Sequence, residues 1–366
     1  MKKFIPLFIL LLCMCLPAFA EEARDMTADC EITLSPGKYK TLDRICDRDW
    51  HTIYLSNKMK SPSVTVKAPK DEPMQGVYVC FGDKLAPWQV QEKQDGKWVT
   101  VFESEGLYAH EYAPVNGAME IRILPKSTKQ TTLCIGELFV YGEGDLPSTV
   151  QFWQPAPEKA DILFLAAHPD DEVLFFGGAI PYYAGEKQMD VAVVYMTCNM
   201  MERRSELLNG LWTCGVKTYP VVADFWDKYA TKVDKIYDAW GKNASQKFIV
   251  EQLRRFKPEV VVTHDTNGEY GHGQHIVYAD LLAQALEAAV NGHVRVHYGY
   301  KRGEYAYVVP GLCAFVDRLT QHIRKYKEEN RHRAGKNEAH PEKPARYPVY
   351  LPVLPAHLRL CQLRND

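Results

Sequence analysis

The sequence predicts two successive folds: an all-β jelly-roll sandwich and, after it, an α/β domain with a mostly parallel sheet. Residues 30–145 consist of short strands with alternating apolar residues, separated by Pro, Gly and Asp turns. From residue 161 onward, apolar strands alternate with helical segments, which is the rhythm of a parallel sheet covered by helices. A stretch of loop composition with several prolines, residues 142–159, separates the two patterns.

The first twenty residues have the composition of a targeting segment. Lys2 and Lys3 precede an apolar run over residues 4–16, and Pro17-Ala18-Phe19-Ala20 ends in a signal-peptidase pattern. The apolar run is too short to span a bilayer comfortably. We therefore expect a secreted or periplasmic protein that is cleaved after Ala20 and has no transmembrane segment in its mature chain.

The net charge does not favour nucleic acid as a partner. The 366 residues carry a formal net charge of −2 at pH 7, and 46% of them are hydrophobic, which is enough for two sizeable cores. Neither a G-x-G-x-x-G nor a G-x-x-x-x-G-K-[ST] pattern follows a predicted strand, so the sequence does not indicate nucleotide binding.

Eight cysteines remain after cleavage, four on each side of residue 150. In an oxidising compartment this even division permits disulfides within each domain, and Cys30–Cys46 with Cys80–Cys134 is the preferred pairing. Buried free thiols are the alternative, because Cys80 and Cys134 each lie inside an apolar strand pattern.

The β-rich region carries a pattern that resembles a known group of domains. The predicted strands cover residues 63–67, 76–81, 98–102, 118–124 and 132–141. Asp47-Arg48-Asp49-Trp50-His51-Thr52 and the closing segment 135–142 are similar to the discoidin, or coagulation-factor type C, group of galactose-binding-like jelly rolls. Members of that group often bind carbohydrate, so the resemblance implies carbohydrate bound by the N-terminal domain. Trp50 and Tyr108 are candidates for this contact, with core packing as the alternative.

The α/β region presents polar residues directly after two predicted strands. An apolar strand over residues 162–167 ends at His168-Pro169-Asp170-Asp171-Glu172, and the strand 259–263 leads into a Gly-rich loop with His272 and His275. Ligands of open α/β sheets bind beyond the carboxyl ends of the strands. A set of histidines with a carboxylate is what a catalytic Zn²⁺ uses, with three protein ligands and one open position. The alternative is that Asp170 and Asp171 only cap a helix over residues 172–185.

The pairing of Ala-His-Pro-Asp-Asp-Glu with Asn-Gly-Glu-Tyr-Gly-His-x-x-His resembles the PIG-L, or LmbE-like, family of zinc-dependent de-N-acetylases. The resemblance covers about residues 161–290 and implies a Rossmann-like α/β fold. It implies that His168, Asp171 and His275 bind the metal, for which Fe²⁺ or Co²⁺ would also fit. It further assigns Asp170 as the general base and places Tyr270 and His272 at the reacting carbonyl.

One departure from the family lies between the two histidines. Many members have Pro-Asp where this chain has Gly273-Gln274, so a carboxylate that could orient His272 is missing. Arg203 belongs to an Arg-x-x-Glu pattern with Glu206, and the resemblance implies that Arg203 reaches the substrate. An i, i+3 ion pair in solvent is the alternative reading of these two residues. His264 and Asp265 are expected to line the site or to orient a ligand.

These observations give a predicted organisation and function. The predicted segments are 1–20 signal peptide, 25–145 discoidin-like sandwich, 146–160 linker, 161–292 deacetylase domain and 293–366 divergent C-terminal segment. The predicted function is that of an exported, zinc-dependent hydrolase that removes the acetyl group of an N-acetylglucosamine-type sugar or glycan. A hydrolase of another amide bond and a glycan-binding protein with an inactive enzyme domain are the alternatives, and release of acetate distinguishes both from the main prediction.

Overall fold

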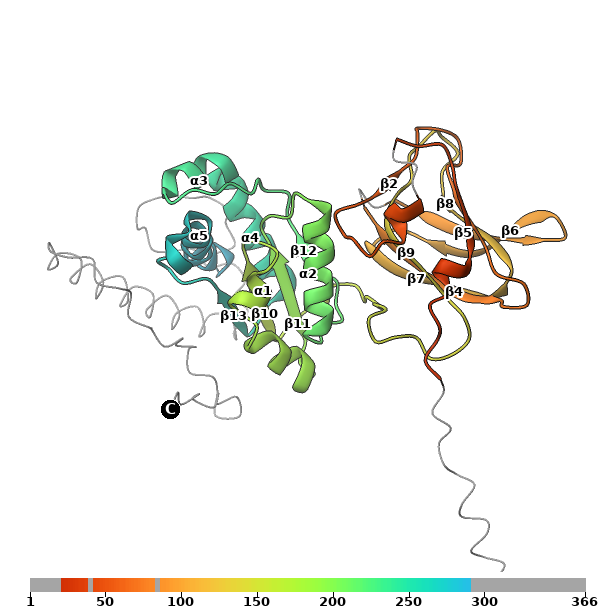
Figure 1. Ribbon diagram of the computed structural model, residues 1–366. Coiled ribbons are helices and arrows are strands. Elements are labelled where there is room, and N and C mark those ends of the chain that lie inside the picture. Colours follow the sequence, from red (N-terminus) through yellow and green to blue (C-terminus); the bar gives the residue numbers. More distant parts are fainter. Residues whose placement is uncertain (1–20, 39–41, 83–85, 291–366) are drawn as a thin grey trace, which may run out of the picture. The chain divides into compact units, whose positions relative to one another are not determined.

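The computed structural model describes residues 21–38, 42–82 and 86–290. The predicted signal peptide and the C-terminal segment 293–366 lie outside the described residues. The chain divides into two compact units, and Figure 1 labels the helices and strands that they contain. The first unit contains residues up to 157 together with 166–227, and the second contains 158–165 together with the residues from 228 onward. None of the described helices is both long and apolar enough to cross a membrane.

Two antiparallel sheets build the N-terminal part of the first unit, as predicted. One sheet has the strand order β1-β3-β8-β5-β6 and the other has the order β2-β9-β4-β7. The strands are β1 (Glu31–Leu34), β2 (Tyr54–Leu55), β3 (Val64–Lys67), β4 (Met74–Phe81), β5 (Trp88–Gln94), β6 (Lys97–Ser104), β7 (His110–Ala118), β8 (Glu120–Pro125) and β9 (Cys134–Tyr141), with short 3-10 turns η1 (Thr27–Asp29) and η2 (Leu42–Ile45).

The core of this part comes from the inward-facing side chains of both sheets. Val64 and Val66 of β3 lie opposite Ile123 and Ile121 of β8, and all four side chains are fully buried. Successive residues of a strand point to opposite faces, so one apolar residue in two is enough to fill the space between two sheets. This alternation is the signal from which the sequence predicted these strands.

The strand β7 was missed by the sequence analysis. It contains Pro114 and the Asn116-Gly117 pair, and both of those last residues have a positive φ, of 48° and 93°. Such residues usually mark turns. They are tolerated here because β7 lies at the edge of its sheet, where a proline need not donate to a further strand.

A parallel sheet with the strand order β12-β11-β10-β13 confirms the predicted α/β region. Residues 162–165 of β10 pair with residues 260–263 of β13, and the amides of Met196 and Thr197 donate to the carbonyls of Ala166 and Ala167. The elements are β10 (Ile162–Ala166), α1 (Asp171–Leu174), η3 (Pro181–Glu186), β11 (Val191–Tyr195), α2 (Met201–Thr213), β12 (Val221–Val222), α3 (Val233–Trp240), α4 (Lys242–Phe256), β13 (Val260–Thr263), η4 (Glu269–Gly271) and α5 (Gly273–Val290).

The long helix expected over residues 172–185 is wrong. The helix α1 ends at Leu174, and a turn leads to the π-helical segment η3. Gly177 and Gly178 weaken a helix, and Pro181 begins a new helical segment rather than continuing the old one. A β-carbon at Gly177 would lie 2.3 Å from the carbonyl oxygen of Val173, so the chain also needs glycine for close backbone packing.

The preferred disulfide pairing is wrong for the cysteines before residue 150. Cys30, Cys46 and Cys80 are free thiols in the structure, and of these Cys80 is buried, as in the alternative, whereas Cys30 and Cys46 are partly buried. Burial raises the pKa of the Cys30 and Cys46 thiols to about 11, with neighbouring carboxylates as a further cause for Cys30. Such thiols are poor nucleophiles at neutral pH.

A buried histidine joins β7 to α2 within the first unit. His110 is 1% exposed, and its two ring nitrogens lie 3.0 Å from Gln151 Oε1 and 3.2 Å from Ser205 Oγ. The Trp50 ring stacks on this imidazole at 5.5 Å, and Tyr108 packs against the ring of Tyr219. Both aromatic residues that the sequence offered for carbohydrate binding therefore have packing partners, as the alternative reading had it.

Protonation of His110 is disfavoured in the native protein. Burial lowers the pKa of its imidazole to about 4, from an ordinary value of 6.5, and the charge of Arg204 adds to this effect. The unfolded chain therefore binds this proton at a higher pH than the native protein does. The stability that His110 contributes is present above pH 6.5 and is lost as the pH falls towards 4.

We predict that this histidine accounts for a loss of about 3 kcal/mol of stability on acidification from neutral pH to pH 4. In His110→Gln, which cannot titrate, the difference between unfolding free energies at pH 7 and pH 4.5 should be clearly smaller than in the wild type. Urea unfolding followed by tryptophan fluorescence measures it. The matched control is His51→Gln, since His51 has a side chain that is 68% exposed. An identical pH response in His110→Gln and the wild type would contradict the prediction.

Candidate metal and catalytic site

The loop that follows β10 contributes two of the predicted metal ligands. All five residues of β10 are buried, and this fixes where the loop begins. The amide of His168 donates to Asp171 Oδ2 at 2.7 Å, and His168 Nδ1 lies 3.5 Å from the same oxygen. Both side chains are buried, so their polar atoms face the interior of the site rather than solvent. A divalent metal binds a neutral imidazole and an ionised carboxylate, in place of the protons that these groups would otherwise hold. A buried imidazole beside a buried carboxylate is such a pair of ligands.

Asp170 is held in a backbone conformation that side chains rarely adopt. Its φ is 107°, and its amide donates to Glu172 Oε2 at 2.9 Å. Its carboxylate forms an ion pair of 2.8 Å with Arg203 Nη2, and that guanidinium also donates to the Pro169 carbonyl. No side-chain cap bond from Asp170 to α1 is formed, which contradicts the helix-cap reading for this residue. Strain of this kind is typical of functional sites.

Glu172 accepts a hydrogen bond from the backbone amide of Asp170, a role that the sequence did not predict. It is 2% exposed and accepts the hydroxyl of Tyr195 at 2.9 Å. Burial raises the pKa of the Glu172 carboxyl to about 7, and the hydrogen bonds from Tyr195 and the Asp170 amide oppose this rise. The sequence carries a signal for a role of Glu172, because this third carboxylate directly follows the two candidate site residues Asp170 and Asp171.

Arg203 at the start of α2 has two carboxylate partners. Besides Asp170, its guanidinium binds Glu206 with an Nη1–Oε2 distance of 2.6 Å. The i, i+3 ion pair with Glu206 is therefore present, and the arginine also reaches the loop after β10. Arg203 is 30% exposed, so part of its guanidinium remains open to a further ligand.

The second half of the site lies on the loop between β13 and α5 and is organised by Glu269. Glu269 Oε2 lies 2.7 Å from His275 Nδ1 and 3.0 Å from His264 Nδ1. Burial alone would raise the pKa of Glu269, but the hydrogen bonds with His264 and His275 outweigh it and hold the pKa below its ordinary value. An imidazole fixed through Nδ1 presents Nε2 to a metal. Glu269 belongs to the sequence motif, but its role in orienting His264 and His275 was not predicted.

Three imidazole rings stack in this half. His264 and His275 have ring centroids 3.9 Å apart, and those of His272 and His275 are 4.5 Å apart. Tyr270 is 74% exposed and has a φ of 45°, with its ring 5.7 Å from that of His272. The backbone N–H of Gln274 donates to His272 Nδ1 at 3.3 Å. A backbone N–H therefore faces His272 at the position where the family's carboxylate is missing.

Five buried side chains form two overlapping groups with the spacing of metal ligands. His168, His272 and His275 make one group, Asp171, His264 and His275 make the other, and the ligand atoms within each group lie within 4.8 Å of one another. The three predicted ligands, His168, Asp171 and His275, all belong to these groups. Imidazole nitrogens with one carboxylate oxygen suit Zn²⁺, Fe²⁺ or Co²⁺ better than Ca²⁺ or Mg²⁺. The residues therefore fit a transition-metal ion.

Solved structures with similarity to this chain include small sugar-binding domains. The family 32 carbohydrate-binding module of NanJ from Clostridium perfringens, solved in complex with galactose, has 16% identity and a TM-score of 0.27, and covers 32% of this chain and 97% of that one. The lectin domain of lectinolysin, complexed with Lewis b antigen, has 18% identity and a TM-score of 0.29, and covers 34% of this chain and 99% of that one.

The curated relatives of this chain are deacetylases by name. A 1D-myo-inositol 2-acetamido-2-deoxy-alpha-D-glucopyranoside deacetylase of Mycobacterium sp. (strain KMS) is 30% identical in an alignment of 159 positions that covers 35% of this chain and 50% of the relative. The enzyme of the same name from Mycolicibacterium smegmatis is 29% identical in an alignment of 162 positions that covers 36% of this chain and 55% of the relative. The chain thus spans about half the length of the relatives it matches.

A family model matches the part of the chain that contains both halves of the site. It is described as PIG-L: GlcNAc-PI de-N-acetylase, and it covers residues 163–286. This range begins within β10 and ends within α5, so it includes all five side chains of the two metal-ligand groups. Residues 163–286 are a PIG-L family domain.

Proposed function

We propose that this protein is a metal-dependent de-N-acetylase that hydrolyses the acetamido group of an N-acetylglucosamine-type sugar. The observation that carries the proposal is the set of five buried imidazole and carboxylate side chains with metal-ligand spacing. The PIG-L match over residues 163–286 and the 2-acetamido sugar deacetylases among the relatives support the same reaction class.

In this proposal His168, Asp171 and His275 hold the metal, with Zn²⁺ as the preferred ion. When bound, the metal supplies a water of lowered pKa and polarises the acetamido carbonyl. Glu269 keeps His275 in the tautomer that offers Nε2, because its carboxylate accepts the hydrogen of Nδ1 at 2.7 Å. His264 is held by the same carboxylate oxygen, at 3.0 Å.

Asp170 acts as the general base. Its side chain is 46% exposed, so a water can reach it, and the ion pair with Arg203 fixes its orientation. Asp170 takes a proton from the water, whose oxygen bonds to the acetyl carbon. His272 and Tyr270 donate to the carbonyl oxygen as negative charge develops there. The C–N bond then breaks and the leaving nitrogen takes the proton that Asp170 accepted from the water, which restores the Asp170 carboxylate and gives acetate and the free amino sugar.

Export is part of the proposal and rests on the first twenty residues. Lys2 and Lys3, the apolar run over 4–16 and the Ala18-Phe19-Ala20 ending support a protein that acts outside the cytoplasm. Hydrolysis of another amide remains the nearer competing function, and glycan binding without catalysis is the competitor from another class. Acetate release from N-acetylglucosamine and its oligomers, measured on the metal-loaded protein, separates the three.

Substitutions of the two neighbouring aspartates should differ in their effects on bound zinc and on turnover. Asp171→Ala removes a ligand, so the bound zinc should fall well below that of the wild type. Asp170→Asn keeps the shape of the side chain without a base, so zinc should stay bound while turnover falls by about 10² to 10⁴. Zinc stoichiometry and acetate release on the two variants measure this. A zinc-replete and fully active Asp170→Asn protein would end the proposed mechanism.

Glu269 should act on metal affinity. In Glu269→Gln the amide has one acceptor oxygen and no charge, so the two imidazoles lose their common anionic partner. Zinc affinity should fall by about 10- to 100-fold, as measured by competition with a chromophoric chelator. Asp265→Asn is the matched control, because that carboxylate accepts the Asn267 amide at 2.7 Å, a bond that asparagine retains. Equal zinc affinity in Glu269→Gln and the control would remove Glu269 from this role.

A further inference from the structure

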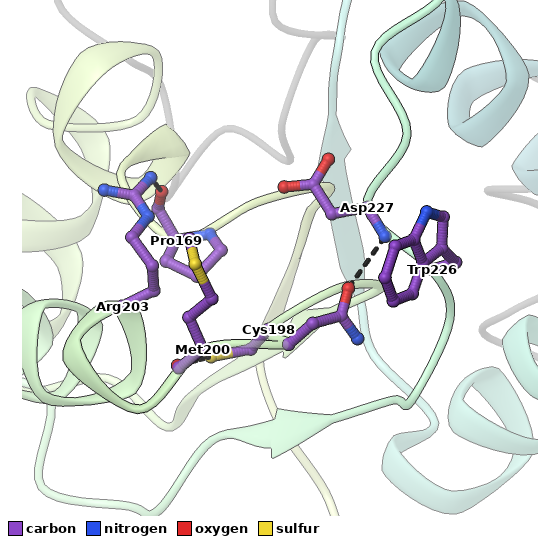
Figure 2. A pocket seen from close by; sticks show the side chains of 7 residues that line it. Pro169, Cys198, Met200, Arg203, Trp226 and Asp227 are labelled. Atoms are coloured by element: carbon purple, nitrogen blue, oxygen red, sulfur yellow. Dashed lines mark hydrogen bonds between the residues drawn. The ribbon is translucent and has the colours of Figure 1, made fainter.

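A small cavity adjoins the loop after β10 within the first unit. Its volume is about 160 Å³. Figure 2 shows Arg203, Pro169 and Met200 on one side, and Asp227 and Trp226 on the other. Pockets that enclose drug-sized ligands measure roughly 300–1,000 Å³. This cavity therefore suits one ring of a ligand and leaves the rest of a longer ligand outside.

The cavity wall presents apolar side chains that a folded protein normally covers. Trp226 is 64% exposed and Met200 is 53% exposed. Exposed large apolar groups at the rim of a cavity are informative, since tryptophan is usually well buried. An indole ring offers a flat, electron-rich face, against which the C–H face of a pyranose ring packs.

The same cavity has one anionic and one cationic polar group. Asp227 Oδ1 lies 3.7 Å from His168 Nε2, so this end of the cavity is next to a proposed metal ligand. Arg203 lines the cavity and reaches Asp170 at 2.8 Å. A sugar hydroxyl both donates and accepts hydrogen bonds, so a ring with several hydroxyls satisfies Asp227 and Arg203 together.

Asn199 holds the segment that carries Trp226 and Asp227. Its Oδ1 accepts the amide of Asp227 at 2.7 Å, and its Nδ2 donates to the Phe225 carbonyl at 3.3 Å. The two bonds bracket Trp226 on both sides, and Figure 2 marks the first of them. One side-chain amide thus fixes the backbone from which the indole and the carboxylate project.

We propose that this cavity is the subsite for the sugar ring that carries the acetamido group, with Trp226 as its stacking platform and Asn199 as the positioning residue. The inference rests on the proposed function and deepens it, because it names the residues of this chain that recognise the sugar ring. Its place beside His168 and Asp170 follows from the contacts of Asp227 and Arg203.

Substitution of Trp226 tests the subsite by kinetics. Trp226→Ala should raise KM for N-acetylglucosamine and chitobiose by about 5- to 50-fold, the range that stacked rings lose on alanine substitution, with kcat changed less than threefold. Trp226→Phe should restore most of the affinity. Bound zinc should not change, because Trp226 is not among the proposed metal ligands. The matched control is Trp98→Ala, since Trp98 is a half-buried tryptophan on β6 that contacts Arg122.

Asn199→Ala tests the positioning role. It should raise KM for chitobiose in the same direction as Trp226→Ala while leaving bound zinc unchanged. A loss of bound zinc in either variant would show a general structural defect and overturn the proposal.

Calorimetric titration with chitobiose measures binding at the subsite separately from hydrolysis. Binding that is kept in Trp98→Ala and lost in Trp226→Ala supports the subsite even if no acetate is released, in which case only the proposed function fails. Binding that is unchanged by Trp226→Ala, or absent from the wild type at millimolar chitobiose, overturns the subsite.

Discussion

The left-handed turn at Asp170 is the constraint on which the site depends. Two adjacent carboxylates in an ordinary helix start would both seek the same N-terminal amides. With φ at 107°, Asp170 turns outward to Arg203, while the carboxylate of Asp171 accepts the amide of His168. The turn persists because the Arg203 guanidinium and the Glu172 carboxylate hold it from both sides. The two neighbouring carboxylates thereby have separate partners, the Arg203 guanidinium for Asp170 and the His168 amide for Asp171.

The buried Glu172 and the partly buried Glu269 support the two halves of the site, and their partners shift their pKa values in opposite directions. Glu172 meets neutral donors, the Tyr195 hydroxyl and the Asp170 amide, so burial dominates and raises its pKa to about 7. Glu269 meets two imidazoles, whose hydrogen bonds outweigh burial and lower its pKa. Glu172 therefore supports the backbone at Asp170 through neutral donors, whereas Glu269 keeps a negative charge that increases the basicity of its histidines.

The sequence predicted what is local and missed what depends on contacts between distant residues. The strands before His168 and His264 could be predicted because each is a short apolar run that ends in polar residues. The roles of Glu269 and Asn199 could not, because they depend on which atoms a folded loop brings within 3 Å or so of one another. The helix over 172–185 failed for a local reason, since Gly177, Gly178 and Pro181 were given less weight than the apolar residues around them.

The sandwich and the loop after β10 both contact helix α2 of the first unit. Ser205 of α2 contacts the buried His110, and Arg203, two positions earlier on the same helix, binds Asp170. Residues two apart on a helix point to different sides, so α2 can bind β7 on one side and the loop after β10 on another. Trp50 stacks on His110, and the ring of Tyr108 packs at a tilt against that of Tyr219, so both aromatic rings contribute to this packing. The sandwich therefore helps to fix the helix that carries Arg203, and in the proposed enzyme the sugar contact falls to the Trp226 cavity beside the reacting groups.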